Sequence, residues 1–352
     1  MPGQLSEAEL SLLTQPEVVS HRPLHPKHGP HDPRPNLPVR RANSIRRTTT
    51  IDTARPNGVL HDVEIDARGR DLLTLGDGST TELDTATVSA LVGHEDRTLS
   101  TVNAGSDLDM SDLLGFGVSA GFRDRLNAAY PEGKSSHSAR YQILDDFPTA
   151  FLVSGYAIGA AGQQPKRTGA RLQVPDLCAG FAVGATILTE EEATNQIPVV
   201  TGPVASPLLE TNKDSQAFHT VAPMAAHGMR RLRCIDLWRD GSLVMIENYF
   251  RDSHMSPEGV ETVVHEYTVD ATFDPRTAMF VSSDAMVHTL PWLECPLAAA
   301  SAARVNGLAA EGLRAFVRVD FTGPSTCTHL NDTLRAMEDV PALAAQLPPV
   351  TP

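Results

Sequence analysis

Four residues in the last third of the chain have side chains suited to holding a metal ion. They are His265, Cys295, Cys327 and His329. Two thiolates and two imidazoles bind Zn²⁺ tetrahedrally, and iron accepts the same ligand types. However, Cys327-x-His329 is not the spacing of a zinc finger, and the other two residues lie far away in sequence. The competing interpretation is that both cysteines are small buried apolar residues, which is the most common role of a free cysteine.

The same segment could instead perform acid–base chemistry. His329 and Asp332 are three residues apart in an expected helix, so they share a face, and the carboxylate would fix the tautomer of the imidazole and raise its pKa. Cys327 would lie at the N-terminus of this helix, where the dipole favours the thiolate and could make it a nucleophile. The structural alternative is that Thr326 or Thr328 caps the helix and His329 satisfies a backbone group.

Four further side chains are predicted to contact a substrate. Arg251 and His254 follow an expected strand, and Trp292 and Glu294 precede an expected helix. Ser253 lies directly before His254, but the members of a catalytic triad meet in space rather than in sequence. The sequence contains no Gly-x-Ser-x-Gly elbow, P-loop or dinucleotide fingerprint, so it gives no support to ATP-dependent or NAD-dependent chemistry.

The elements that must position these residues occur twice in the chain. The stretch 46–52 (RRTTTID) precedes the turn Asn57-Gly58, and the stretch 230–236 (RRLRCID) precedes the turn Asp240-Gly241. Asn-Gly and Asp-Gly between alternating apolar residues are signals of a β-hairpin. A second hairpin follows in each copy, at a constant offset. The order of these matches indicates an internal duplication.

Two helices are expected after the hairpins of each copy. The matching positions are Gly121 and Gly312, Arg123 and Arg314, His137 and His329, and Pro148 and Pro341. Because proline cannot continue a helix, the last helix of each copy is expected to end at Pro148 and at Pro341. The sequence therefore predicts an α+β fold of two pseudo-equivalent units, residues 45–148 and 230–345, each an antiparallel sheet with helices packed on one face.

Three segments lie outside the repeat. Residues 1–44 are rich in Pro, His and Arg and are predicted to form a disordered tail, and residues 346–352 form a second tail. The tail histidines have a spacing that could hold a metal, but a tail without a folded site is the preferred interpretation. Residues 149–229 are rich in Gly and Ala yet too apolar for a free linker, so they are predicted to be a packed insert or lid.

Charge and composition limit the partners. The 352 residues carry a formal net charge of -14, which disfavours nucleic acid as a partner. The basic cluster at the edge of the tail is expected to be a solvated linker; it consists of Arg40, Arg41, Arg46 and Arg47. No apolar run is long enough for a membrane span, and the N-terminus does not have the pattern of a signal peptide. We therefore expect a cytoplasmic protein whose cysteines form no disulfides. The expected partner is a small molecule, and the protein could form a homo-oligomer.

The second copy is the one expected to carry the site. His329 corresponds to His137, but Cys327 corresponds to a serine and His265 falls near Asp84. Nothing in the first copy resembles the segment Pro291-Trp-Leu-Glu-Cys-Pro. If the shared fold required these residues, both copies should contain them, so their asymmetry favours a functional role in the second copy.

Residues from about His265 to Val340 resemble the bacterial domain of unknown function 2889. The similarity lies in His265-Glu-Tyr, in a cysteine shortly after a proline, and in Cys327-Thr-His-Leu. Glu266 stands where the family usually has Asp, and Thr326 where it usually has Gly. The resemblance implies a bacterial origin and makes His265, Cys295, Cys327 and His329 family positions. It implies no activity, and most members are shorter than this chain.

These observations predict a catabolic enzyme acting on a small, fairly apolar (acyl or aromatic) molecule. The reaction would be of lyase, hydratase, isomerase or hydrolase type, with zinc or iron as the metals that would fit. His329 would be the acid and base, oriented by Asp332, and His265 and Cys327 would complete the site. The alternatives are a non-catalytic module that binds a ligand or metal, and an accessory subunit of another enzyme.

Overall fold

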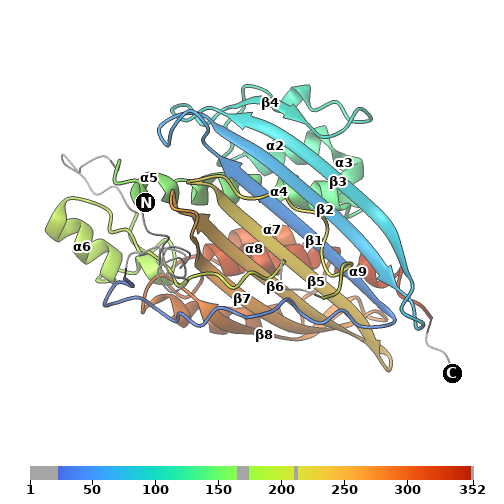
Figure 1. The fold of residues 1–352 in the computed structure, drawn as a ribbon. Helices are drawn as coiled ribbons and strands as arrows, with labels where there is room; N and C mark the ends of the chain where they lie inside the picture. Colours follow the sequence, from blue (N-terminus) through green and yellow to red (C-terminus); the bar gives the residue numbers. More distant parts are fainter. Residues whose placement is uncertain (1–22, 165–173, 210–212, 350–352) are drawn as a thin grey trace, which may run out of the picture.

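One antiparallel sheet runs through the whole protein (Figure 1). The computed structural model describes residues 23–164, 174–209 and 213–349, and eight strands of these residues form the sheet in the order β4-β3-β2-β1-β5-β6-β7-β8. The strands are β1 (Ser44–Ala54), β2 (Val63–Thr74), β3 (Thr80–Val92), β4 (Leu99–Asn103), β5 (Met229–Asp240), β6 (Leu243–Met255), β7 (Glu261–Asp274) and β8 (Met279–Thr289). The turn between β5 and β6 has Gly241 at φ +58°, as its Asp-Gly sequence predicts.

The strand order is the same on both sides of a central seam. Four consecutive strands lie on each side, and the first strand of each half, β1 or β5, lies at the seam. Arg46 of β1 donates two hydrogen bonds to Asp236 of β5 (2.6 and 2.7 Å), and Arg230 of β5 donates two to Asp52 of β1 (both 2.7 Å). The predicted fold class, two pseudo-equivalent α+β units, is confirmed; that they arose by duplication stays a prediction.

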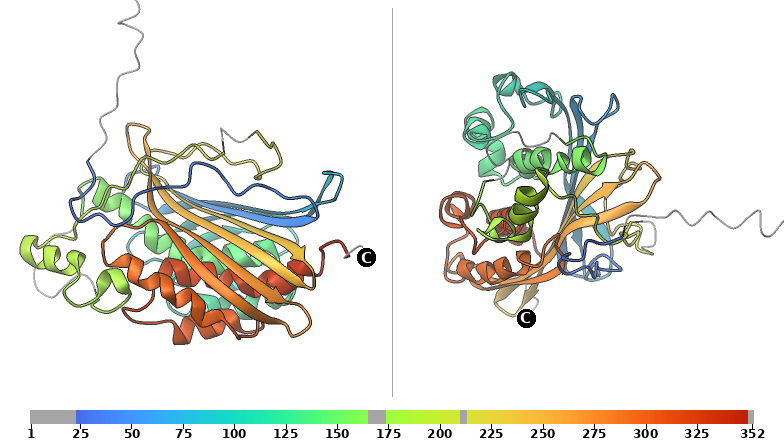
Figure 2. Two further views of the ribbon diagram at one scale, coloured as in Figure 1. Left: turned by 90° about the horizontal axis from the view of Figure 1, so that it is seen from below. Right: turned by 90° about the vertical axis from the view of Figure 1, so that its left-hand side faces the viewer.

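Helices cover one face of the sheet (Figure 2). The first unit contributes η1 (Ser111–Leu113), α2 (Phe122–Ala129), α3 (Pro131–Ser135) and α4 (Ala139–Ser154). The second unit contributes η3 (Cys295–Val305), α7 (Leu313–Asp320), α8 (Thr328–Arg335), η4 (Ala336–Asp339) and α9 (Val340–Ala344). Each unit buries its own apolar cluster between strands and helices, for example Phe122 and Phe147 in the first and Phe250 and Leu330 in the second. None of the helices described is long and apolar enough to cross a membrane.

Helix α4 differs from the prediction. It continues through Pro148 to Ser154, whereas Pro341 lies in the first turn of α9. Proline cannot donate the backbone hydrogen bond to the carbonyl of Leu144, yet the helix continues. In the same turn, Arg123 Nε donates to the carbonyl oxygen of Asp145 at 2.9 Å. The expected helix end at Pro148 is therefore wrong, and Pro341 begins a helix rather than ending one.

The insert packs against the second unit. It contains α5 (Tyr156–Ala160), η2 (Ala179–Phe181) and α6 (Thr186–Thr194), which lie at one end of the sheet (Figure 1). Ile187 and Leu188 of α6 are buried in the apolar cluster of the second unit. The insert is thus part of the core there.

The second face of the sheet is covered by irregular chain. Residues 23–43 and the end of the insert cross this face as extended segments, dark blue and yellow in Figure 1. Leu37 and Phe218 are buried against Leu232 and Tyr249 of the sheet. Arg34 donates to Glu247 at 2.8 Å. This part of the predicted disordered tail is therefore packed, while residues 1–22 and 350–352 lie outside the described residues.

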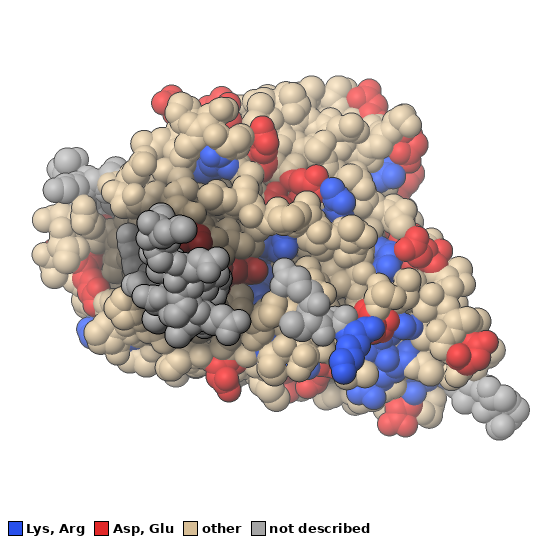
Figure 3. Space-filling view, viewed as in Figure 1, with Lys and Arg blue, Asp and Glu red and all other residues tan. Residues whose placement is uncertain are grey.

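The basic cluster at positions 40 to 47 is not a solvated linker. The side chains of Arg46 and Arg47 are at most 2% exposed and form ion pairs with Asp236 and with Asp71. They lie in β1 at the centre of the sheet, where helices cover one face and irregular chain covers the other. A buried charge requires a partner. Basic side chains on this side of the molecule gather near the end that carries the C-terminus, and elsewhere they are interspersed with acidic ones (Figure 3).

Candidate functional site

Three side chains meet between the sheet and helix α8. Asp252 lies near the end of β6, His265 near the start of β7, and His329 in the first turn of α8. Asp252 and His265 are direct partners in the β6–β7 ladder, so their side chains point to the same face. The register shifts immediately after this pair. Helix α8 packs on that face and brings the third residue. We call Asp252, His265 and His329 the triad.

The three side chains are close enough to share one ion. One ligand atom from each lies within 4.8 Å of those of the other two. His329 Nε2 is 3.7 Å from Asp252 Oδ2. The imidazole rings of His265 and His329 are stacked, with centroids 3.5 Å apart and an angle of 17° between planes. It is the one such group of histidine, cysteine and carboxylate side chains in the part of the chain that the structure describes.

Both imidazoles are neutral. Burial lowers the pKa of His329 to about 3, with a further contribution from the nearby Arg231. Burial and the facing ring of His329 lower the pKa of His265 well below its ordinary value. The prediction of a raised pKa for His329 is therefore wrong, because loss of solvent outweighs the carboxylates. Neutral imidazole offers a lone pair, the form in which histidine binds metals.

Two of the ring nitrogens have no hydrogen-bond partner among the described residues. They are His265 Nδ1 and His329 Nε2, and both are buried. A buried polar atom without a partner costs about 1–3 kcal/mol, so such atoms are rare unless a water or an ion satisfies them. The other ring nitrogen of His329, Nδ1, lies 3.4 Å from Thr328 Oγ1 and 3.8 Å from Cys327 Sγ. A proton on Nδ1 would leave the lone pair of Nε2 free.

Arg231 positions the carboxylate of the triad. Its Nε and Nη2 donate to the two oxygens of Asp252 at 3.0 and 2.9 Å, and its Nη1 donates to Asp332 at 2.9 Å. Burial alone would raise the pKa of Asp332, but Arg231 and Arg123 lower it to about 2. Asp332 therefore shares helix α8 with His329 but accepts a hydrogen bond from Arg231, and it forms none with His329. Asp252, rather than Asp332, brings a carboxylate oxygen to 3.7 Å from His329 Nε2.

The cysteines do not complete the predicted ligand set. Burial raises the pKa of the Cys327 thiol, so the predicted thiolate is not favoured at the N-cap of α8. Cys295 lies at the start of η3, so close to Gly180 of the insert that a Cβ there would be 2.8 Å from its Sγ. Both cysteines are buried and unpaired, and within the described residues neither belongs to a group with metal-binding distances. Their packing matches the competing interpretation.

Two of the residues predicted to contact a substrate, Arg251 and His254, are buried and contact other protein side chains. Arg251 points to the opposite face of the sheet from its neighbour Asp252 and forms an ion pair with Glu266 at 2.8 Å. His254 contacts the ring of Tyr156, and burial lowers its pKa to about 4.

The remaining two hold the insert and the N-terminal segment. Glu294 accepts hydrogen bonds from the backbone N–H and the hydroxyl of Thr186 at 3.0 and 2.8 Å. Trp292 is buried with its ring against that of His25. Glu294 thus caps α6, and Trp292 anchors the segment before β1.

Asp252 is the member of the triad that the sequence did not single out. The hairpin gave only part of the signal. Counting outward from the turn around Gly259 places Val264 opposite Asp252, and the register shift between Asp252 and Ser253 puts His265 there instead. Strand alternation then separates Asp252 from Arg251.

Fold and site define an antiparallel α+β protein with a buried cluster of two histidines and one carboxylate. Residues 229–343 match the family described as "Protein of unknown function (DUF2889)", and this C-terminal part of the chain belongs to that family. The matched region runs from β5 into α9 and contains the whole triad. Comparisons with curated proteins and with solved structures give no match.

Proposed function

We propose that the triad binds one divalent transition-metal ion and that this ion makes the second unit a metal-assisted enzyme for a small molecule. Two neutral imidazoles and one carboxylate suit Zn²⁺ and Fe²⁺. Three protein ligands leave a position for water or substrate, as in catalytic rather than structural zinc sites. Because a metal-bound water loses a proton near neutral pH, hydrolysis or hydration is the reaction class that fits best.

The observation that carries the proposal is the pair of buried ring nitrogens without partners. His265 Nδ1 and His329 Nε2 lie in the same small group as a carboxylate held by Arg231. A metal ligand is also a better role for His329 than an acid–base residue. With a pKa of about 3 it carries no proton to donate at neutral pH and is a weak base.

The surroundings favour a fairly apolar substrate. The ring centroid of Phe250 lies 6.4 Å from that of His329. The side chains of Cys327 and Tyr267, which contact each other, also lie in this part of the core. All three of these side chains are buried. An acyl or aromatic molecule with one polar group for the ion would match this environment.

Metal content is the direct test. The purified full chain, reconstituted with Zn²⁺ or with Fe²⁺ without oxygen, is expected to retain about one ion per chain after gel filtration. His265→Gln and His329→Gln are expected to lose it. His254→Gln is the matched control, because His254 is also buried at the end of β6 but lies outside the triad. Equal metal content in all four proteins, or none in the wild type, would refute the site.

A second measurement separates catalysis from a structural or ligand-holding role. Co²⁺ in the site should give an absorption spectrum that changes when azide is added, because azide occupies an open coordination position. A spectrum that does not respond to azide would indicate a closed site and a non-catalytic module.

A further inference from the structure

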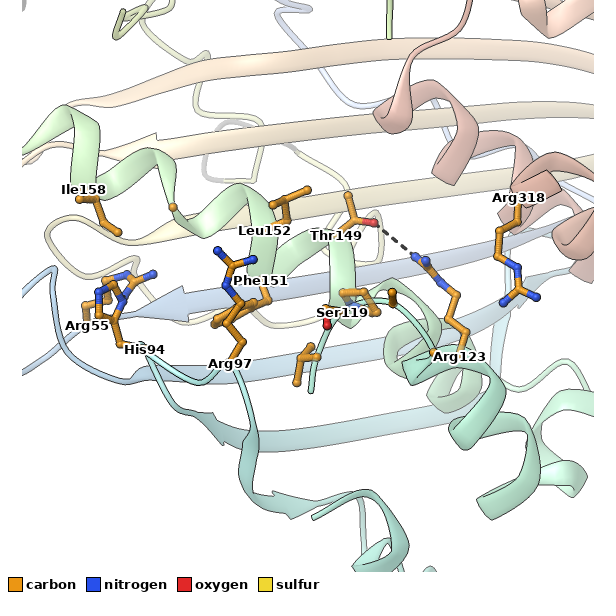
Figure 4. Close-up of a pocket in the computed structure, with 15 residues that line it drawn as sticks. Arg55, His94, Arg97, Ser119, Arg123, Thr149, Phe151, Leu152, Ile158 and Arg318 are labelled. Atoms are coloured by element: carbon orange, nitrogen blue, oxygen red, sulfur yellow. Dashed lines mark hydrogen bonds between the residues drawn. The ribbon is translucent and has the colours of Figure 1, made fainter. Parts of the chain in front are cut away.

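A cavity of about 390 Å³ lies apart from the triad, mainly in the first unit (Figure 4). One wall is α4 and the start of α5, and the opposite wall is formed by the loops on either side of β4. Its lining includes Arg55, His94, Arg97, Phe151, Leu152 and Ile158. Its size is typical of pockets that take small molecules.

The charged side chains of this cavity are all basic. Four arginines and one histidine line it, and no Asp or Glu is among the described lining residues. This is the reverse of the whole chain, which has a net charge of -14. Two of the arginines are already paired: Arg123 lies 3.4 Å from Asp145, and Arg318 is 2.9 Å from Asp124.

The other two arginines have no carboxylate partner among the described residues. Arg55 is 7% exposed, and within the described parts of the chain its guanidinium forms hydrogen bonds with neutral groups: the carbonyl oxygen of His61, the hydroxyl of Ser154 and a ring nitrogen of His94. No described residue forms a hydrogen bond with its Nε. Arg97 is exposed, and none of the described residues forms an ion pair with it. A buried guanidinium without a counter-ion is costly, so an anion in the cavity would relieve this cost.

The rest of the lining is suited to a hydrocarbon. Phe151, Leu152 and Ile158 come from α4 and α5, and Figure 4 shows Phe151 and Leu152 between the basic groups at the two ends of the cavity. Leu152 leaves 60% of its surface exposed, although it lies on a helix that is otherwise largely buried. Exposed apolar surface beside unpaired positive charge is what an amphipathic small molecule would cover.

The N-terminus of α2 adds to the preference for an anion. Ser119, Ala120 and Gly121 line the cavity, and Gly121 is the N-cap of this eight-residue helix. Among the residues that the structure describes, no side chain caps the N–H groups of its first turn, and the helix dipole places partial positive charge there.

We propose that this cavity binds a small organic anion, with a carboxylate or monophosphate head near Arg55 and Arg97 and an apolar body against Phe151, Leu152 and Ile158. The cavity belongs mainly to the part of the chain outside the family match, and the proposal does not depend on the metal site. A carboxylate and a phosphate can both accept two parallel hydrogen bonds from one guanidinium, so arginine binds either head group.

Binding of benzoate, phenyl phosphate and benzamide to the full chain by calorimetry tests this proposal. Both anions, or one of them, are expected to bind, and neutral benzamide about tenfold or more weaker, because it lacks the charge-assisted bonds. The tighter of the two anions identifies the head group. The titration is repeated after treatment with a chelator, and unchanged affinity would separate this cavity from the metal site.

Substitution of Arg97 keeps the test independent of folding. Arg97→Gln changes an exposed side chain and is expected to weaken benzoate or phenyl phosphate about tenfold, and Arg55→Gln at least as much. Arg276→Gln is the control, because Arg276 is also exposed but pairs with Asp274 in the second unit. Equal binding of benzamide and the anions, unchanged affinity in Arg97→Gln, or no binding of any probe would overturn the proposal.

Discussion

Asp252 and Asp332 both accept hydrogen bonds from Arg231, but only Asp252 belongs to the triad. Both aspartates are buried, and only Asp252 lies within reach of the two imidazoles. Substituting each in turn therefore distinguishes a metal ligand from a residue that only pairs with Arg231. Loss of a ligand and loss of an ion pair should therefore have different consequences at these two positions.

We predict that Asp252→Asn lowers the metal affinity of the full chain by about a hundredfold or more, whereas Asp332→Asn lowers it by no more than about tenfold. Both variants should lose about 3–5 kcal/mol of unfolding free energy, since each removes one of the two buried carboxylates that pair with the buried guanidinium of Arg231. Competition with a chromophoric chelator measures the affinity, and urea unfolding measures the stability. If the two variants bind metal equally well, Asp252 is not a ligand.

The triad also shows where residue types alone mislead. The two histidines are recognisable from their chemistry, and both belong to the triad. The cysteines have equally suitable chemistry, yet Cys295 is directed toward Gly180 and the thiol of Cys327 is neutral. Direction and burial depend on packing between segments far apart in the chain, and single positions do not contain this information.

At the scale of elements, Glu294 caps a helix that is remote in sequence. The N-cap residue of α6, Ala185, has no side chain that can accept a hydrogen bond, and Glu294 accepts from the first N–H of this helix instead. A substrate ligand was expected at this position. An acidic side chain at a helix N-terminus is stabilising both as a hydrogen-bond acceptor and against the helix dipole.

We predict that Glu294→Ala raises amide hydrogen exchange across residues 186–194 by about fivefold or more, equivalent to about 1 kcal/mol of lost local stability. Exchange in the central strands should remain unchanged, because only the docking of the insert is weakened. Glu311→Ala, an exposed acidic position in the same unit, is the control. Unchanged protection of α6 in Glu294→Ala would show that apolar packing of Ile187 and Leu188 alone holds the insert.

Local sequence signals predict the hairpins and most helices, but not every boundary. Turn residues and strand alternation act over a few positions, so the strands and the fold class follow from them. Pro148 is different, because α4 continues past it although proline removes a backbone hydrogen bond. The packed segment 23–43 has the composition of a free tail, and its order comes from partners in the sheet such as Glu247. Long-range contacts explain the error in the tail segment.

At the scale of the whole molecule, buried ion pairs join the two units. Arg335 of the second unit donates to both oxygens of Asp145 in α4 at 2.6 and 2.7 Å, and Arg47 of β1 donates to Asp339 at 2.8 Å. All of these groups are buried. A buried charge that loses its partner is far more costly than an exposed one, so either unit alone would leave charges unmatched.

Removal of one such charge in the first unit should therefore destabilise the second unit as well. Burial alone would raise the pKa of Asp145, but Arg335, Arg123 and Arg314 lower it, so the carboxylate is ionised at neutral pH. Asp145→Asn leaves these arginines without that charge and is predicted to cost about 3–5 kcal/mol of unfolding free energy. Both tryptophans, Trp238 and Trp292, lie in the second unit, and their fluorescence reports its unfolding in urea.

If the halves unfold together, the tryptophan transition of Asp145→Asn moves to lower urea, and hydrogen exchange in β2 and β3 increases to the same extent. Asp107→Asn is the matched control in the first unit, because the side chain of Asp107 is 68% exposed in its pair with Arg140, and it should change stability by less than about 0.5 kcal/mol. A tryptophan transition that stays in place while exchange rises only in the first unit would mean that the seam joins two independently stable units. One cooperative transition would instead mean that the part of the chain that matches the family depends on the first unit for its stability.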